Sequence, residues 1–243
     1  MFSIRSWRYS GKGYALGQEQ NPNTSQISII IPALNAATTL PCTLSALDSA
    51  GEVIVVDGGS RDGTAAVAEA HDARVVTSRR GRGSQIAAGI AAARNPWLLL
   101  LHADTRLAPG WHRAAARHMH LHPEKAGYFH LAFDSDSPKA RRLERAVAWR
   151  CRILALPYGD QGLLIHRDLL TQAGGIRPLL LMEDVDLVRR LGRARLTPLD
   201  ATATTSAARY DRDGWTRRSM RNLFCLTLWF IGVPPRLIAL IYA

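Results

Sequence analysis

The chain has 243 residues, of which 47% are hydrophobic and 21% charged, so it can bury one sizeable core. Its formal net charge is +11, and nearly all of its basic residues are arginines, since only Lys12, Lys125 and Lys139 are lysines. Arginine favours bidentate binding of phosphate. Charge alone does not choose between nucleic acid, anionic lipid and a nucleotide substrate.

The three cysteines, Cys42, Cys151 and Cys225, are widely spaced and odd in number. They match neither a metal-binding spacing nor a disulfide framework, which favours a reducing compartment and predicts a cytoplasmic protein. Residues 1–26 lack the apolar core of a signal peptide and are rich in Gly, Ser, Gln and Asn. They predict a flexible leader.

Short apolar runs alternate with helix-like stretches in the first half of the chain. Strands are predicted over residues 27–35, 52–60, 73–78 and 97–105. Helices are predicted over residues 36–49, 64–71 and 84–94. This order predicts an α/β fold with a mostly parallel sheet flanked by helices. Right-handed crossovers would place the strand ends on one edge, where open α/β sheets bind ligands. These ends are Pro32, Asp57, Ser78 and His102.

The second half is less regular. Helices are predicted over residues 109–121, 138–156 and 183–192, and strands over residues 127–133 and 162–168. No internal repeat and no obvious linker interrupts the sequence, so we expect one domain over residues 27–210. Residues 211–243 would then form a C-terminal helical segment.

The C-terminal segment is apolar from residue 223 to residue 243, about the length that a membrane span needs. Gly232, Pro234 and Arg236 interrupt it, which argues against one straight span and favours two short helices packed on the domain. Peripheral attachment to the inner face of the cell membrane stays open as an alternative, because residues 215–221 supply cationic side chains just upstream.

Two segments in the first half are candidates for nucleotide binding. Asp57 follows a buried strand and precedes Gly58 and Gly59, so its carboxylate could accept hydrogen bonds from a base or a ribose, or cap the turn itself. Arg79 and Arg82 lie in an Arg-Gly loop before a helix, where they could hold a pyrophosphate or form a solvated basic loop. The loop has neither P-loop spacing nor a Rossmann fingerprint.

His102 and Asp104 follow the apolar run that begins at Trp97. Two residues apart at a strand end, their side chains would point the same way. An imidazole and a carboxylate can both bind Mn²⁺, and Mg²⁺ would accept the carboxylate. The phosphates of a ligand would have to complete such a site.

Acidic residues cluster at two places in the second half. Glu183 and Asp184 begin a helix, where a carboxylate could act as general base on an acceptor hydroxyl; Asp186 is expected to compensate the helix dipole instead. Asp160 and Gln161 form a polar pair just before a strand.

In chain order, several of these segments together resemble glycosyltransferase family 2. The segments are IPALN, VVDGGSRDGT, the Arg-Gly loop with Gln85 and Gly89, LLLLHADT, GDQG and EDVDLVRRL. The resemblance covers about residues 27–210 and implies the GT-A fold, a Rossmann-like mostly parallel sheet, and transfer of a sugar from a nucleotide donor with inversion. The short length, GDQG and MEDVDL look most like a small bacterial subgroup labelled arsenosugar-biosynthesis-type glycosyltransferases.

The resemblance also implies a donor and metal site. Pro32 and Asn35 would lie in the first nucleotide-binding turn, and Asp57 would contact the nucleobase, typically uracil. Asp104, with His102, takes the place of the family's D-x-D motif and would bind Mg²⁺ or Mn²⁺. His102 departs from that motif, in which an acid is usual. The frequent Asn-Glu pair after the first strand is also absent, since alanine follows Asn35.

On the acceptor side, the resemblance implies that Asp184 is the catalytic base, with Glu183 beside it. Asp160 and Gln161 would lie near an acceptor that the sequence does not identify. The implied function is therefore metal-assisted inverting transfer from a UDP-linked or similar sugar.

Three other functions compete with this interpretation. A nucleotidyltransferase would usually carry a Gly-rich loop with Lys or Arg after the first strand, and the segment PALNAATTL argues against it. A non-catalytic nucleotide-sugar binding protein stays open because of His102. A nucleic-acid binder would explain the charge but not the buried strands that end in acids, so we expect no nucleic-acid partner.

Overall fold

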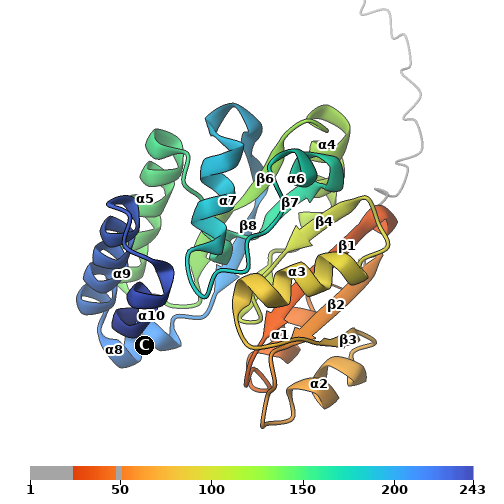
Figure 1. The fold of residues 1–243 in the computed structure, drawn as a ribbon, viewed down its shortest axis with the longest axis horizontal. Coiled ribbons are helices and arrows are strands. Elements are labelled where there is room, and N and C mark those ends of the chain that lie inside the picture. Colours follow the sequence, from red (N-terminus) through yellow and green to blue (C-terminus); the bar gives the residue numbers. More distant parts are fainter. Residues whose placement is uncertain (1–23, 48–50, 243) are drawn as a thin grey trace, which may run out of the picture.

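The computed structural model describes residues 24–47 and 51–242 (Figure 1). The predicted leader lies outside the described residues except for Thr24–Gln26, which form a 3-10 turn. The described strands form one eight-stranded sheet in the order β3-β2-β1-β4-β7-β6-β8-β5. They are β1 Ile27–Ala33, β2 Glu52–Asp57, β3 Arg74–Thr77, β4 Trp97–Leu100, β5 Thr105–Leu107, β6 Ala126–Phe133, β7 Leu163–His166 and β8 Leu196–Thr205. The helices are α1 Leu40–Leu44, α2 Thr64–Ala70, α3 Arg82–Ala92, α4 Trp111–Leu121, α5 Pro138–Leu154, α6 Arg167–Gln172, α7 Glu183–Leu191, α8 Ala208–Asp213, α9 Trp215–Phe230 and α10 Pro235–Tyr242.

The first part of the sheet is parallel. β1 pairs with β2 and β4, and β2 with β3, all in parallel. β7 runs antiparallel to β4 and to β6, whereas β6 and β8 are again parallel. The predicted α/β fold with a mostly parallel sheet is therefore confirmed, with antiparallel strands in its second half.

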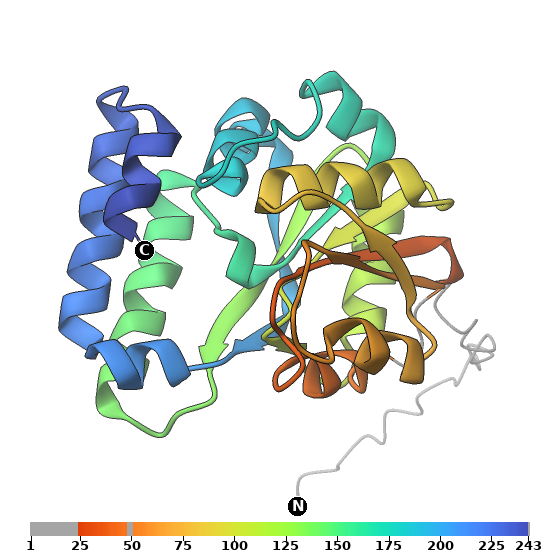
Figure 2. The same cartoon turned by 60° about the horizontal axis from the view of Figure 1, so that its bottom comes forward.

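Helices cover both faces of this sheet, as Figure 2 shows. Every residue of β1 is buried, and alternate side chains of a strand point to opposite faces. Ile29 and Ile31 accordingly pack in a core with residues of α1, α2 and α4. Ile30 packs in a second core with residues of α3, α5, α6 and α7. A strand buried on both faces reads as a continuous apolar run, which explains the sequence pattern.

Several features differ from the predicted elements. The helix predicted over residues 36–49 is confined in the described part to Leu40–Leu44, because the loop after β2 holds residues 36 and 37 as a turn. Ala36 donates its backbone N–H to Thr64 Oγ1 at 2.8 Å, and Ala37 donates to Asp62 Oδ2 at 3.1 Å. Strands β5 and β8 and helix α6 were not predicted, and α6 begins inside the strand predicted over residues 162–168.

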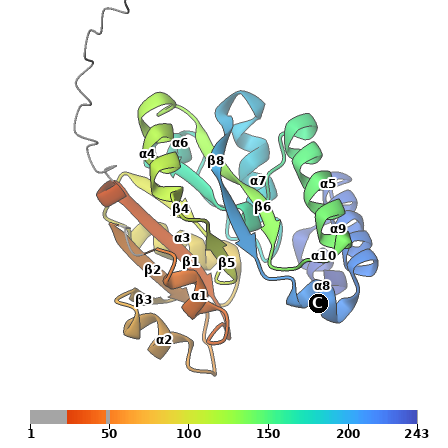
Figure 3. The same ribbon diagram turned by 180° about the vertical axis from the view of Figure 1, so that it is seen from behind.

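The C-terminal segment forms the two helices that the sequence favours. The basic segment of residues 215–221 belongs to α9, which therefore begins before the apolar run. Cys225 and Ile238 pack with Leu181, Met182 and Val185 around α7. Figure 3 shows α9 and α10 beside α5 at one side of the molecule. No described helix is long and apolar enough to cross a membrane. The division between residues 210 and 211 falls inside α8 and stays a prediction.

Candidate active site

Two adjoining cavities lie beyond the carboxyl ends of β1 and β4. The first, the outer cleft, is lined by residues 32–36 and 80–82 and has a cavity volume of about 400 Å³. The second, the inner cavity, is lined by the start of α7 and by α8, α9 and α10 and has a cavity volume of about 130 Å³. Both cavities share a set of residues that we call the junction: Arg82, His102, Asp104, Ser206 and Arg209.

The turn after β1 forms one wall of the outer cleft. Asn35 adopts a left-handed backbone conformation with φ of 50°, which asparagine tolerates better than most residues. Its side-chain oxygen accepts a hydrogen bond from the N–H of Arg61 at 2.9 Å, and its own N–H donates to Ser60 Oγ at 2.9 Å. Pro32 and Asn35 thus line the cleft on a turn that the loop after β2 holds in place.

Asp57 ends β2 and caps the turn that follows it. Its carboxylate accepts hydrogen bonds from the N–H groups of Gly59 and Ser60 and from the Ser60 hydroxyl. This is the turn-capping role that the sequence left open. Contact between Asp57 and a nucleobase stays a prediction.

His102 and Asp104 lie on a turn, because β4 ends at Leu100, before either residue. Neighbouring elements hold this turn: Thr43 Oγ1 donates to the carbonyl of Ala103 at 3.1 Å, and the N–H of Ser206 donates to the carbonyl of Asp104 at 3.0 Å. Both predicted residues line both cavities. The predicted strand end is therefore a turn beyond the strand, and both residues line the cavities from it.

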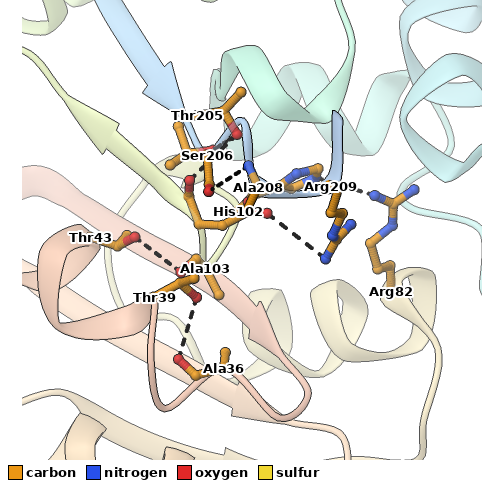
Figure 4. Close-up of polar contacts among 12 residues, drawn as sticks. Ala36, Thr39, Thr43, Arg82, His102, Ala103, Thr205, Ser206, Ala208 and Arg209 are labelled. Atoms are coloured by element: carbon orange, nitrogen blue, oxygen red, sulfur yellow. Dashed lines mark hydrogen bonds and ion pairs between the residues drawn. The ribbon is translucent and has the colours of Figure 1, made fainter. Parts of the chain in front are cut away.

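Arginines approach this turn from two directions. Figure 4 shows Arg82 extending from α3 and Arg209 from the start of α8. Arg82 Nη1 lies 3.5 Å from His102 Nε2, and Arg209 Nη2 lies 3.8 Å from Asp104 Oδ2. Burial, reinforced by the charge of Arg82, lowers the pKa of His102 to about 4. The imidazole is therefore neutral near pH 7 and can accept a hydrogen bond or offer a lone pair to a metal.

Glu183 holds Arg82 from the opposite side. Its side chain is only 1% exposed, and Oε1 lies 2.8 Å from Arg82 Nε. The two groups are close but poorly aligned, since neither carboxylate oxygen makes a regular hydrogen bond. Burial raises the pKa of Glu183 to about 7, while Arg82 opposes that shift. Glu183 is thus an anchor for an arginine of the junction.

Asp184 follows Glu183 but faces the inner cavity. Its Oδ2 accepts a hydrogen bond from the N–H of Gly159 at 2.7 Å, and its Oδ1 accepts one from the N–H of Val185 at 2.8 Å. These bonds fix the carboxylate at the start of α7. A Cβ at Gly159 would lie 3.2 Å from Asp184 Oδ2 and closer still to His102, so glycine allows this approach.

Asp160 and Gln161 point in different directions. Asp160 lines the inner cavity, burial raises its pKa to about 6, and its Oδ1 has no hydrogen-bond partner among the described residues. The Gln161 amide is buried, donates to the carbonyl of Phe129 at 3.0 Å and accepts from the N–H of Tyr158 at 3.2 Å. The structure therefore places Asp160 at the cavity and Gln161 in the support behind it.

Residues 28–178 match the sequence profile described as Glycosyl transferase family 2, which is more than half of the chain. The chain belongs to glycosyltransferase family 2. The family predicted from the ordered motifs is confirmed, whereas the arsenosugar-type subgroup stays a prediction.

Curated relatives of this family 2 member align over part of its length. An uncharacterised glycosyltransferase of Mycobacterium tuberculosis (strain ATCC 25618 / H37Rv) is 38% identical over 85 residues, covering 35% of this chain and 39% of the relative. An undecaprenyl-phosphate 4-deoxy-4-formamido-L-arabinose transferase of Shewanella sediminis is 33% identical over 106 residues, covering 37% and 32%. The alignments thus span less than half of each relative.

Solved structures share the fold. Glucosyl-3-phosphoglycerate synthase from M. tuberculosis, in complex with Mn²⁺ and UDP-glucose, superposes with a TM-score of 0.56 at 19% identity, covering 86% of this chain and 80% of that chain. TarS 1–349 of S. aureus superposes with a TM-score of 0.60 at 16% identity, covering 90% and 69%. At these identities the likeness establishes the fold alone.

The family match ends at residue 178, before much of the site. The sequence did not single out Arg209, Tyr210, Arg218 or Asn222, which line the inner cavity from α8 and α9. No motif surrounds them, and excess basic charge was the only signal for the two arginines. Arg79 is exposed and does not line the outer cleft, where Arg80 and Arg82 do.

Proposed function

We propose that this family 2 member transfers a sugar from a nucleoside diphosphate sugar, with UDP as the expected nucleotide, to an acceptor hydroxyl with inversion at the anomeric carbon. The observation that carries this proposal is the position of Asp184. Its carboxylate faces the inner cavity, which shares Arg82, His102 and Asp104 with the outer cleft. A base and a diphosphate site would then flank the point where the cavities meet.

The outer cleft is the proposed donor site. The turn at Pro32 and Asn35 would contact the nucleoside, with Asp57 beside it. The diphosphate would lie at the junction, where Arg82 and Arg209 supply positive charge. Guanidinium groups bind phosphate oxygens in pairs and stay charged at any physiological pH. Arg79, on the exposed loop before α3, is a weaker candidate for the same role.

The proposed reaction is a single displacement. Asp184 accepts the proton of the acceptor hydroxyl, whose oxygen forms a bond to the anomeric carbon. The bond between that carbon and the diphosphate oxygen breaks on the opposite face, and its electron pair leaves with the nucleoside diphosphate. The hydrogen bond from Gly159 keeps Asp184 oriented, and the arginines stabilise the charge that develops on the leaving group.

A divalent cation fits the donor atoms at the junction. The described residues hold no cluster of three or more His, Cys, Asp and Glu able to bind a metal, so ligand phosphates would have to complete the site. Asp104 is partly exposed and only loosely paired with Arg209, and His102 is neutral, so both retain lone pairs. Bound Mg²⁺ or Mn²⁺ would neutralise diphosphate charge there.

The inner cavity is the proposed acceptor site. Asp160 offers an unpartnered oxygen to a hydroxyl, and Tyr158 and Tyr210 line the same cavity. Gln161 would act by positioning Tyr158. We place the enzyme in the cytoplasm, which its free cysteines suit, with peripheral contact to the membrane through its C-terminal helices.

A panel of nucleotide sugars tests the function. The full chain is incubated with each sugar and Mg²⁺ or Mn²⁺, and release of the nucleoside diphosphate is measured. We expect release from a UDP-sugar, and loss of it with Asp184→Asn. Tight UDP binding without transfer or hydrolysis under either metal would instead identify a binding protein. Pyrophosphate release from a nucleoside triphosphate and a sugar phosphate would identify a nucleotidyltransferase.

The metal has a separate test that does not need turnover. UDP affinity is measured by calorimetry with Mn²⁺ and with EDTA, in the parent and in His102→Asp. Because a second carboxylate would complete the usual acidic pair, we expect Mn²⁺ to strengthen UDP binding several-fold more in the variant. Equal metal enhancement in both proteins would mean that a second carboxylate at position 102 adds nothing to the metal site.

A further inference from the structure

The outer face of α9 carries large apolar side chains that are exposed. Met220, Leu223, Phe224 and Phe230 recur at helical spacing along it, and Ile231 follows at its end. Their exposed fractions range from 45% to 71%. Contiguous exposed apolar surface of this kind marks an interaction site.

Helix α10 continues this face. Leu237, Leu240 and Ile241 are exposed at spacings of three and one, whereas Ile238 is buried against α9 and α7. The opposite faces of the same two helices line the inner cavity through Arg218, Asn222, Leu226 and Tyr242. One pair of helices thus presents an apolar surface outward and a wall of the site inward. We call the outward set the apolar face: Met220, Leu223, Phe224, Phe230, Ile231, Leu237, Leu240 and Ile241.

Positive charge accompanies the apolar face. Residues 215–242 contain Arg217, Arg218, Arg221 and Arg236 and no acidic residue. Arg217 and Arg236 are exposed, each within a helical turn of an apolar-face residue. Arg189 of α7 lies 4.8 Å from the ring centroid of Phe230. Arginines at the border of an apolar helical surface are typical of helices that lie in a membrane interface.

The end of α5 extends this surface. Trp149, Ile153 and Leu154 are exposed there. Arg193, just after α7, donates to the carbonyls of Arg152 and Ile153, while Arg189 near the end of α7 contacts Phe230. Helices α5 and α9 therefore both end near the C-terminal end of α7, as Figure 2 also shows. Tryptophan is a side chain that favours the membrane interface.

We propose that the apolar face docks α9 and α10 in the plane of an anionic phospholipid bilayer, with Arg217 and Arg236 on the headgroups. The docking itself does not depend on the reaction, but one consequence rests on the proposed function: the acceptor cavity would open close to the headgroup layer. A second copy of the chain suits the face less well, because it would bring the same positive charge against it.

Vesicle co-sedimentation of the full chain tests this proposal. One set of vesicles is phosphatidylcholine mixed with phosphatidylglycerol, and the other is pure phosphatidylcholine. We expect binding to the anionic vesicles that weakens with salt, and much less binding to the neutral ones. In Phe224→Ser/Ile231→Ser, the bound fraction should fall by about tenfold, since two apolar side chains that would enter the bilayer are lost.

Leu121→Ser is the matched apolar control. Leu121 is 51% exposed at the end of α4, away from α9 and α10, and its substitution should leave vesicle binding unchanged. Arg217→Gln/Arg236→Gln should lose the preference for anionic vesicles. UDP binding and donor hydrolysis without vesicles should equal those of the parent in each variant, so a failed reaction and a failed docking surface give different results.

Equal sedimentation of the parent with both vesicle types, or with neither, would overturn the proposal. An equal loss of binding in Leu121→Ser and Phe224→Ser/Ile231→Ser would overturn it as well. A parent that is dimeric in sedimentation equilibrium, and that Phe224→Ser/Ile231→Ser makes monomeric, would assign the face to a second copy instead.

Discussion

The outer cleft and the inner cavity of the site are built in different ways. The outer cleft is formed mostly by strand–turn–helix units within the family match, and backbone turns such as the one at Asn35 shape it. The inner cavity is formed largely by residues beyond 178, from helices that meet only in the folded chain. Burial raises the pKa of Asp160, which lines this cavity, and of Glu183, which lies behind Arg82.

The two cavities differ in how much charge must be buried to form them. Local turns and buried apolar strands position the outer cleft without burying many charged groups. Burial of carboxylates disfavours their charged form, so the acidic groups at and behind the inner cavity depend on pairing such as that of Glu183 with Arg82. We therefore expect substitutions near the inner cavity to change activity or stability through charge, and substitutions near the outer cleft to change stability through packing.

Asp184→Asn should have the largest effect on the reaction. Asparagine keeps an oxygen for the N–H of Gly159 but cannot accept the acceptor's proton, so kcat should fall by about 10²–10⁴. UDP affinity, measured by calorimetry, should stay the same because the outer cleft is untouched. Near-normal turnover in this variant would mean that the inner cavity does not supply the base.

Glu183→Gln tests the buried charge through the pH dependence of stability. The folded-state pKa of about 7 lies above the ordinary 4.5, so folding favours the protonated acid. The contribution of this group is full below pH 4.5 and is lost as the pH rises toward 7, on the order of 3 kcal/mol. Urea unfolding should show that decline in the parent and a flatter profile in Glu183→Gln. Stability profiles that run parallel in the two proteins would contradict a raised pKa at Glu183.

Gly89→Ala tests packing on the donor side. An added Cβ would lie 2.9 Å from Val56 Cγ2 and nearer still to Ile30, because α3 packs tightly on β1 and β2. Overpacking of this kind costs about 1–3 kcal/mol of unfolding free energy. The loss should be independent of pH, unlike that of Glu183. Gly63→Ala, where a Cβ meets no atom within 4 Å, is the control in the same half.

The outer cleft was also easier to predict than the inner cavity. Apolar runs and turn residues predicted β1, β2 and β4 with their carboxyl ends on one edge of the sheet, because such signals are local in the sequence. The predicted helix over residues 36–49 was too long because the contact of Ala36 with Thr64 is tertiary. β8 was missed because its partners β5 and β6 lie far away in the chain.

The same limit applied to individual site residues. His102, Asp104 and Asp184 were predicted because they stand in short motifs, and they do line the cavities. Gln161 stands in such a motif as well, yet its amide supports the backbone, since a motif does not reveal which way a side chain points. Arg209 stands in no motif and reaches Asp104 only through the fold.

Arg209→Ala should have the smallest effect of these four substitutions. It tests a residue that the fold, and no sequence motif, places at the site. The side chain is exposed and lies 3.8 Å from Asp104, so its removal should weaken UDP binding only by about threefold to tenfold. UMP, which lacks the second phosphate, should lose less affinity than UDP. Arg212→Ala on the same helix is the matched control, because Arg212 pairs with Asp213 instead. If UDP and UMP lose affinity equally, Arg209 does not contact the diphosphate, and positive charge at the junction comes from Arg82 on the donor side.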